Sequence, residues 1–355
     1  MRGTGAYCNH AAAPTRHCPL IRRTALHILF VYSRDSTFVT IDRELLARRA
    51  EVRDWPQPRP LVNLLALARA VRTSDLVFGW FASWHTLWPV LLARLFRRPS
   101  VVVIGGFDTA RIPEIDYGLQ QRAVMGRVSR WVMRHATCLV TNSDYSRREI
   151  AANTGIAPEA VRVVHHGVPD PFGRLPAGAR ERLALTVGIV DQRNLERKGL
   201  MTFVRAATLV PDVEFVVAGK WIDGSVEELR AAAADNVTLT GWLEQDELEA
   251  LYRRASVYVQ ASRHEGFGLS VAEAMLAGCV PVVSSAGALP EVVGDAGVVL
   301  EAVAPAPDAV ADGVRRGLAA NGDAREGARR RILDRFTVDA RREQLAQVVD
   351  EAIRS

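Results

Sequence analysis

The chain has 355 residues, of which 48% are hydrophobic and 24% charged, and its formal net charge is +5 at pH 7. This composition excludes a disordered, fibrous or disulfide-rich protein. The length exceeds the roughly 250–300 residues at which single hydrophobic cores stop growing, so we expect two domains. The positive charge suits an anionic partner without identifying it, and no motif indicates a nucleic-acid-binding protein.

The start of the chain and its four cysteines indicate the compartment. The first 23 residues lack the apolar run of a secretory signal, so we expect a disordered tail at 1–23 of a cytoplasmic protein. Cys138 and Cys279 lie in apolar runs and are predicted to be buried thiols in a reducing environment. Cys8 and Cys18 stand near two histidines, but the tail has no periodic structure to hold them, and no metal site is expected.

From residue 25 onward, short strands rich in β-branched and aromatic residues alternate with helical segments. This alternation predicts parallel sheets covered by helices, and the first series forms an expected Rossmann-like domain at 24–168. Its strands are predicted at 25–33, 75–80, 100–106, 137–143 and 161–167, and its helices at 41–50, 85–96, near 118–135 and at 144–153. The uncharged run at 76–93 reaches the lower length limit of a membrane span, but it contains Pro89 and is predicted to be a strand followed by a helix.

A stretch rich in proline and glycine at 169–180 is the predicted linker to a second α/β series. The strands of this series are predicted at 184–190, 213–219, 237–242, 257–262 and 280–285. We expect a second Rossmann-like domain at 181–330 and a C-terminal helix at 331–355, for which one arrangement is packing back on the N-terminal domain. The predicted fold is therefore α/β, with two doubly wound domains in tandem facing a central cleft.

A nicotinamide enzyme is not expected, because the first strand is followed by RDSTFVTID, which contains no glycine and so no dinucleotide-binding fingerprint. The clearest chemical signal lies instead at 262–273, SRHEGFGLSVAE, which contains Glu265, Gly266, Phe267, Gly268, Leu269 and Glu273. The glycines allow backbone to approach a ligand closely. A helix that begins near Leu269 presents free N–H groups and a positive dipole end, which together predict an anion site suited to a diphosphate.

Two carboxylates flank this predicted helix start. Glu273 stands four residues into the helix, about 6 Å further along its axis. One carboxylate can accept hydrogen bonds from sugar hydroxyls and the other from ribose hydroxyls, with phosphates between them, and neither is expected to act as an acid or base. The alternatives are a helix N-terminal charge for Glu265 and a solvated side chain for Glu273. Because Glu273 lies among apolar residues, we expect it to have a partner.

This segment resembles the donor-lobe signature of glycosyltransferase family 4, in which two glutamates separated by seven residues flank a Gly-Phe-Gly turn. The similarity extends from about residue 25 to 300 and includes the segments 141–150, 163–170, 186–199, 237–248 and 287–300. The resemblance implies a GT-B fold, with an N-terminal acceptor domain and a C-terminal domain for a nucleoside-diphosphate sugar. It also implies transfer to a saccharide or lipid-linked acceptor, with retention of configuration and without a metal or cofactor.

The resemblance also implies roles for single residues. Lys198 matches the lysine that neutralises the leaving diphosphate. The arginine usual after the first C-terminal strand is replaced by Ile189, so its role is assigned to Arg193, with Arg197 as the alternative. The backbone near Gly241 and Leu243 is expected to contact the base, and Ser36 and Thr37 either cap a helix or meet the phosphates.

The largest departure from the family pattern is at 103–109, VIGGFDT, where Gly105 stands in place of a histidine. Asp108 remains in this turn, and it either orients the acceptor or donor sugar as a catalytic residue or caps the following segment. Pro290 and Glu291 resemble a family loop near the donor and receive no role. Because the histidine is missing, a non-catalytic nucleotide-sugar-binding protein is one alternative function. A nucleotide-sugar epimerase or hydrolase is another.

A basic segment of the N-terminal domain raises the question of whether the protein contacts a membrane. The segment 118–137 is basic and amphipathic, with Arg122, Arg127, Arg130 and Arg134 on its polar side. A solvated face over a buried stripe is the simpler interpretation of this pattern. The alternative is peripheral contact with an anionic membrane at its inner face.

Overall fold

Two parallel sheets form the centre of the computed structural model, which describes residues 25–59, 62–175, 180–320 and 322–355. The N-terminal lobe contains β1 (Leu26–Tyr32), β2 (Ala50–Pro56), β3 (Leu76–Trp80), β4 (Ser100–Ile104), β5 (Cys138–Thr141) and β6 (Val161–Val163). The C-terminal lobe contains β7 (Glu181–Val187), β8 (Glu214–Ala218), β9 (Val237–Gly241), β10 (Ala255–Gln260), β11 (Val280–Val283) and β12 (Val298–Val299). Among these residues the strand orders are β2-β1-β3-β4-β5-β6 and β12-β11-β10-β7-β8-β9.

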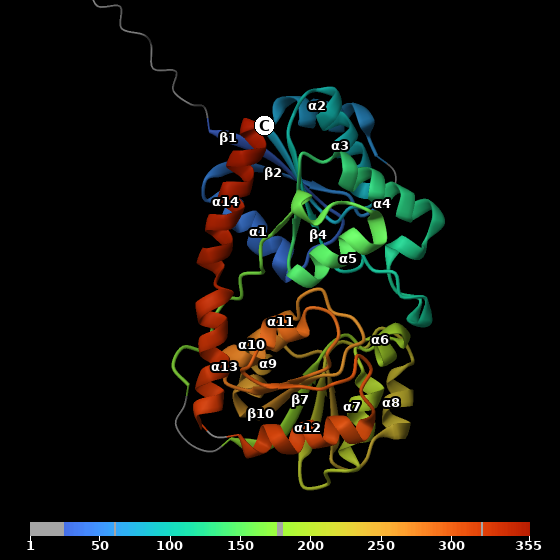
Figure 1. Ribbon diagram of the computed structural model, residues 1–355, viewed down its shortest axis with the longest axis vertical. Coiled ribbons are helices and arrows are strands. Elements are labelled where there is room, and N and C mark those ends of the chain that lie inside the picture. Colours follow the sequence, from blue (N-terminus) through green and yellow to red (C-terminus); the bar gives the residue numbers. More distant parts are fainter. Residues whose placement is uncertain (1–24, 60–61, 176–179, 321) are drawn as a thin grey trace, which may run out of the picture.

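Helices surround both sheets (Figure 1). Those of the N-terminal lobe are α1 (Thr37–Ala47), α2 (Leu64–Thr73), α3 (Trp84–Leu95), α4 (Ala123–His135) and α5 (Asp144–Thr154), with short 3₁₀ turns η1 (Pro113–Ile115), η2 (Leu119–Gln121) and η3 (Pro158–Ala160). The C-terminal lobe has α6 (Gln192–Arg197), α7 (Leu200–Ala207), α8 (Val226–Ala232), α9 (Gln245–Arg254), α10 (Leu269–Leu276), α11 (Leu289–Val293), α12 (Pro307–Ala319) and α13 (Gly322–Arg335), and the chain ends in α14 (Val338–Arg354). The predicted fold class of two doubly wound α/β lobes is confirmed.

The strands near the centre of each sheet are buried along their whole length. Every residue of β3, β4 and β10 is buried, as expected for parallel strands covered on both faces by helices. These strands are short runs of valine, isoleucine and aromatic residues, which fit a sheet interior. Loops at the carboxyl ends of parallel strands carry ligand sites in such sheets. The segments that line the site described below follow β1, β3, β4, β5, β6, β7, β9 and β10.

The two C-terminal helices join the lobes. Ile332 on α13 belongs to the core of the C-terminal lobe, whereas Leu345 and Val349 on α14 belong to the core of the N-terminal lobe. The Arg341 guanidinium on α14 pairs with the Asp42 carboxylate on α1, with an Nη2–Oδ2 distance of 2.7 Å, and both side chains are buried. Figure 1 shows α14 running beside α1 and the upper sheet. The expected domain boundary at 330 falls inside α13.

Several element boundaries differ from the predictions. The helix predicted at 41–50 ends at Ala47, and Ala50 begins β2, which the sequence did not reveal. Residues of β2 alternate between partly buried and exposed, because β2 is an edge strand with charged side chains facing water. The helix predicted near 118–135 begins at Ala123 after η2, and β6 ends at Val163, four residues early. The helix α2 was also not predicted.

The predicted tail, the predicted linker and the four cysteines are covered only in part by the structure. The predicted tail and residues 176–179 of the predicted linker lie outside the described residues, as do Cys8 and Cys18. Cys279 is buried as predicted, but Cys138 is only partly buried at the start of β5. In the part of the chain that the structure describes, no helix is both long enough and apolar enough to cross a bilayer.

Candidate active site

A cavity of about 630 Å³ lies between the two lobes. From the N-terminal lobe it is lined by the loop after β1, the end of β3, the turn after β4, Tyr117, Asn142 and His166. From the C-terminal lobe it is lined by Ile189, Lys198, Trp242, residues 265–270 and Glu273. The predicted donor segment is therefore brought face to face with the N-terminal lobe. The site residues predicted from sequence that line this cavity are Ser36, Thr37, Lys198, Glu265, Gly266, Phe267, Gly268, Leu269 and Glu273.

The helix α10 begins at the cavity wall, as the sequence predicted. Gly268 precedes it with a φ of 103°, a conformation that favours glycine and turns the chain from the loop into the helix. The loop ahead of it packs tightly, since a Cβ atom on Gly287 would lie 2.2 Å from the carbonyl oxygen of Glu265. Gly268, Leu269 and Ser270, at the start of α10, line the cavity, and the first N–H groups of a helix are free to bind an anion.

Lys198 and Glu265 form an ion pair at the cavity wall, with an Nζ–Oε2 distance of 2.6 Å. Both side chains are mostly buried. Burial alone would raise the pKa of Glu265, but the charges of Lys198 and Arg197 outweigh it and the pKa is lowered. Glu265 is therefore an ionised hydrogen-bond acceptor at neutral pH, with cationic groups beside it.

Glu273 occupies a different environment, one turn into α10. Its Oε2 accepts a hydrogen bond from the Tyr252 hydroxyl at 3.1 Å. Tyr252 is therefore the hydrogen-bond partner that was expected for a carboxylate among apolar residues. Burial raises the pKa of Glu273 to about 7, and the Tyr252 hydrogen bond offsets only part of this effect. A ligand hydroxyl that donates to this carboxylate would favour its ionised form.

Glu273→Gln is expected to stabilise the ligand-free protein above pH 7. Between pH 4.5 and about 7 the folded state keeps a proton that the unfolded state has lost, so the free energy of unfolding falls as pH rises through this window. The glutamine has no proton to lose, and we expect it to gain up to about 3 kcal/mol relative to wild type at pH 8. Urea unfolding of both proteins at pH 5 and pH 8 measures the difference. Equal pH dependence in the variant and the wild type would contradict the assignment, and Glu301→Gln at an exposed site of the same lobe is the control.

The structure places the two candidate arginines in different surroundings. Arg193 is exposed on α6 and is not among the described residues that line the cavity. Arg197 is partly buried, lies 4.9 Å from the centroid of the Tyr117 ring, and contributes to the lowered pKa of Glu265. Neither arginine is among the described residues that line the cavity, but Arg197 is the one that lies beside Tyr117 and Glu265, two residues that do line it.

Comparison with known proteins identifies the family. The model of the family described as "Glycosyltransferase Family 4" matches residues 25–170, and that described as "Glycosyl transferases group 1" matches residues 181–320. The chain belongs to glycosyltransferase family 4. The two matches divide where the two sheets divide, so each lobe carries its own family signature.

The relatives with known activities align with only part of this chain. A GDP-mannose:cellobiosyl-diphosphopolyprenol alpha-mannosyltransferase of Xanthomonas campestris is 34% identical over 36% of this chain and 36% of its own length. An MMP alpha-(1->4)-mannosyltransferase of Mycolicibacterium hassiacum is 33% identical over 49% of this chain and 43% of its own length. These alignments thus span less than half of each relative.

Solved structures match over nearly the whole chain. The Anabaena protein HepE, solved in complex with UDP, has a TM-score of 0.74 at 16% identity, covering 92% of this chain and 100% of its own. Sucrose-phosphate synthase of Thermosynechococcus elongatus has a TM-score of 0.72 at 16% identity, covering 92% and 98%. The fold is therefore that of GT-B glycosyltransferases.

The space beside Gly105, where many family 4 members have a histidine, is filled by the ring of Phe81. A Cβ atom on Gly105 would lie 2.3 Å from Cε1 of Phe81, so no side chain fits there while the ring is in place. Phe81 follows β3 and has a φ of 66°, which is rare for a residue with a side chain. Its backbone N–H donates to Val103 O, and Thr86 Oγ1 donates to its carbonyl. The sequence could not reveal this exchange, because 24 residues separate the two positions.

The structure places Asp108 behind Phe81 and outside the main cavity. Its Oδ2 accepts a hydrogen bond from Ala82 N at 2.9 Å, and the side chain lines a neighbouring cavity of about 240 Å³. Burial raises the pKa of Asp108 to about 7. Asp108 is thus not positioned to orient the donor directly.

Ser36 and the segment 241–243 were also predicted to belong to the site, and the structure gives their surroundings. Ser36 Oγ is buried and has no hydrogen-bond partner among the described residues, so it does not cap α1 through its side chain. The backbone near Gly241 and Leu243 is predicted to contact the base, and Trp242, which lies between these residues and has an exposed side chain, lines the cavity. Leu243 packs against the core of the lobe. The sequence signal for Trp242 was its place in the family segment at 237–248.

Glu291, which received no role from sequence, connects the lobes. Its carboxylate accepts hydrogen bonds from the backbone N–H groups of Asp144 and Tyr145, at 2.9 and 3.1 Å, and lies 2.8 Å from Nε2 of His165. A carboxylate of the C-terminal lobe thereby caps the first turn of α5 in the N-terminal lobe.

Further contacts across the cleft adjoin Glu265. The hydroxyl of Ser143 donates to the carbonyl of Gly266 at 2.8 Å. His264 Nε2 lies 2.9 Å from Oε1 of Glu149 on α5, and both side chains are largely buried. These contacts hold the residues on either side of Glu265 against α5, so the position of the donor loop depends on how the lobes close.

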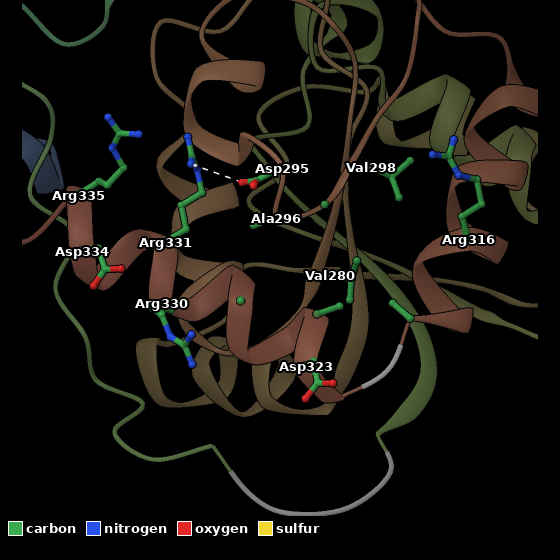
Figure 2. Close-up of a pocket in the computed structure, with 14 residues that line it drawn as sticks. Val280, Asp295, Ala296, Val298, Arg316, Asp323, Arg330, Arg331, Asp334 and Arg335 are labelled. Atoms are coloured by element: carbon green, nitrogen blue, oxygen red, sulfur yellow. Dashed lines mark ion pairs between the residues drawn. The ribbon is translucent and has the colours of Figure 1, made fainter.

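A second cavity of similar volume lies elsewhere on the C-terminal lobe. Figure 2 shows this space of about 650 Å³, bordered by α12, α13 and the β11–β12 edge, with arginines and aspartates interspersed around it. Arg331 and Asp295 form a loose ion pair at 3.9 Å in its wall. None of its described lining residues also lines the cavity between the lobes.

In the described part of the chain, no group of three or more His, Cys, Asp or Glu could hold a metal ion.

Three of the four arginines named in the basic amphipathic segment, Arg122, Arg130 and Arg134, have partners within the protein. Arg122 pairs with Asp116 at 2.7 Å, and Arg130 donates to Gln120 Oε1 at 2.8 Å. Arg134 donates to a backbone carbonyl at the end of α5. These contacts favour a solvated face for α4 over the alternative of a membrane contact.

Proposed function

We propose that this chain transfers a sugar from a nucleoside-diphosphate sugar, bound between the lobes, to a saccharide or lipid-linked acceptor. The observation that carries the proposal is the placement of Lys198, Glu265 and Glu273 around the N-terminus of α10 in one cavity. The Anabaena neighbour HepE was solved with UDP and with UDP-glucose, and the relatives named above are mannosyltransferases, which supports a nucleotide-sugar donor.

In the proposed complex, the diphosphate lies at the start of α10 and accepts its N–H groups, with Lys198 alongside. The bond between the anomeric carbon and the phosphate oxygen breaks, and negative charge accumulates on the departing diphosphate. Lys198 and Arg197 stabilise that charge, so the proposed reaction needs no metal. The acceptor hydroxyl oxygen bonds to the same face of the carbon and passes its proton to the departing phosphate oxygen, so configuration is retained.

In the proposed complex, the carboxylates of Glu265 and Glu273 bind the sugar and the ribose of the donor, respectively. Glu265 accepts hydrogen bonds from hydroxyls of the transferred sugar, because its pKa is low and it stays ionised. Glu273, deeper in the cavity wall, accepts from the ribose. The donor replaces the ion pair between Lys198 and Glu265, with each partner turning to its own group on the ligand.

The proposal is tested by screening UDP, GDP and ADP sugars for thermal stabilisation and then assaying release of the nucleoside diphosphate. Binding to the folded state raises the melting temperature by mass action, and we expect one base to stand out. Glu265→Ala should abolish transfer and Glu301→Ala should not. Solvent deuterium appearing in the recovered sugar would indicate an epimerase instead, and hydrolysis without any transfer would indicate a hydrolase. Stabilisation without turnover would indicate a non-catalytic binding protein.

A further inference from the structure

The carboxylate of Glu149 is a buried charge in the contact between the two lobes. Glu149 lies on α5, which Figure 1 shows on the side of the N-terminal lobe that faces the C-terminal lobe. Its side chain is only 9% exposed. Burying a carboxylate is costly unless hydrogen-bond donors surround it, so the donors around Glu149 indicate what the residue is for.

Three side chains donate to this carboxylate, and they come from three segments of the chain. Oε1 accepts from the Tyr145 hydroxyl at 3.2 Å, one turn earlier on α5, and lies 2.9 Å from Nε2 of His264. Because a carboxylate oxygen only accepts, Nε2 carries the proton. Oε2 accepts from Thr109 Oγ1 at 2.5 Å. The carboxylate therefore connects α5 with the turn after β4 and with the loop before α10 in the other lobe.

Thr109 belongs to the turn that forms part of the donor cavity. This turn follows β4 and contributes Gly105 and Gly106 to the cavity wall. Thr109 is fully buried, and its backbone carbonyl accepts a hydrogen bond from Asn153 Nδ2 at 2.8 Å. Glu149 and Asn153 thus hold the turn against α5 at the same residue.

His264 brings the loop before α10 to the same carboxylate, one residue ahead of Glu265. Its side chain is 1% exposed. The loop and the turn are already in contact, since a Cβ atom on Gly106 would lie 3.2 Å from Cε1 of His264 and 3.4 Å from the Cα atom of Gly266. Packing therefore stops them from moving closer together, and the hydrogen bond between His264 and Glu149 resists their moving apart.

We propose that Glu149 is a positioning residue for sugar transfer, which holds the loop that carries Glu265 against the turn after β4. Glu149 is not among the described residues that line the cavity, so it acts through His264. The inference rests on the proposed function, in which Glu265 binds hydroxyls of the transferred sugar. It adds that the orientation of Glu265 depends on lobe closure, because His264 reaches Glu149 only while the lobes are in contact.

The test combines steady-state kinetics of Glu149→Leu with calorimetry of UDP and GDP binding. We expect kcat to fall about 10- to 100-fold, because a displacement of about 1 Å in a positioned group has effects of this size. Affinity for the nucleotide without its sugar should not change, since the diphosphate is proposed to bind at α10. A purely structural defect would weaken both. Glu51→Leu, which removes a carboxylate paired with His27 at 3.3 Å on the surface of the same lobe, is the matched control and should change neither.

Two further variants show whether the hydrogen bonds are responsible. Glu149→Gln keeps an acceptor for His264 and offers an amide donor to Thr109 Oγ1, so kcat should stay within about fivefold of wild type. His264→Leu breaks the same contact from the other lobe, and it carries the test if Glu149→Leu does not fold. Combining the two leucine substitutions should lower kcat no further than the more damaging one alone, because the pair acts as a unit.

The inference is overturned if Glu149→Leu and His264→Leu both keep the kcat of wild type, or if their effects on kcat multiply in the double variant. Activity of the wild-type chain separates this result from a failure of the proposed function. A wild-type chain that transfers sugar from no donor would overturn the proposed function and this inference with it. An active wild type with equally active variants overturns this inference alone.

Discussion

Lys198→Ala is expected to lower kcat for sugar transfer by about 10²–10³-fold. Lys198 contacts Glu265 in the cavity and is placed beside the start of α10, where the leaving diphosphate is proposed to lie. Its charge matters most as the glycosidic bond breaks, because negative charge then grows on the phosphate oxygen. An interaction that strengthens in the transition state affects kcat more than KM.

Steady-state kinetics with the donor found by thermal screening measure this effect. Lys220→Ala, which removes an exposed lysine of the same lobe, should leave kcat and KM unchanged. Loss of the lysine also frees Glu265, whose pKa should rise toward the value that burial favours. A Lys198→Ala enzyme with wild-type kcat would show that the charge on the diphosphate is stabilised elsewhere.

Arg341→Ala is expected to lower the free energy of unfolding by about 3–5 kcal/mol. The side chains of Arg341 and Asp42 are buried, at 1% and 0% exposure, so the substitution leaves a carboxylate buried without its partner. Arg341 Nη1 also donates to the carbonyl oxygens of Val164 and His165, both at 2.8 Å. These bonds fasten α14 to the N-terminal lobe at the point where the chain passes between the lobes.

Chemical denaturation of Arg341→Ala, with Arg342→Ala as control, tests this expectation. Arg342 is the next residue on α14 and makes a half-exposed pair with Asp339 at 2.9 Å, so its loss should cost no more than about 1 kcal/mol. Asp42→Asn combined with Arg341→Met removes both charges and should destabilise less than Arg341→Ala alone. Equal stability of Arg341→Ala and Arg342→Ala would contradict a structural role for the buried pair.

The donor half of the site was predictable because its signals are local. The segment 262–273 holds two glutamates, a glycine turn and a helix start within twelve consecutive residues, so spacing alone fixes their arrangement. The apolar core strands were also readable, since burial on both faces leaves continuous apolar runs. The edge strand β2 was missed because its charged residues alternate with apolar ones beside a helix.

The features of the site that could not be predicted from the sequence depend on contacts between residues far apart in the chain. Phe81 occupies the space above Gly105 because β3 and β4 are neighbours in the sheet, which no local pattern states. Glu291 caps α5 from the other lobe, and its carboxylate could not be placed without knowing how the lobes meet. The sequence does not distinguish Arg197 from Arg193, because the contact of Arg197 with the Tyr117 ring depends on how α6 packs against the N-terminal lobe.

A crystal structure of the protein with UDP or GDP bound tests the central claim most directly. We predict the diphosphate at the N-terminus of α10, within hydrogen-bond distance of Lys198 Nζ, and the ribose hydroxyls on the Glu273 carboxylate. A nucleotide bound instead in the arginine-lined cavity of Figure 2, or bound between the lobes with its phosphates turned away from α10, would contradict the account.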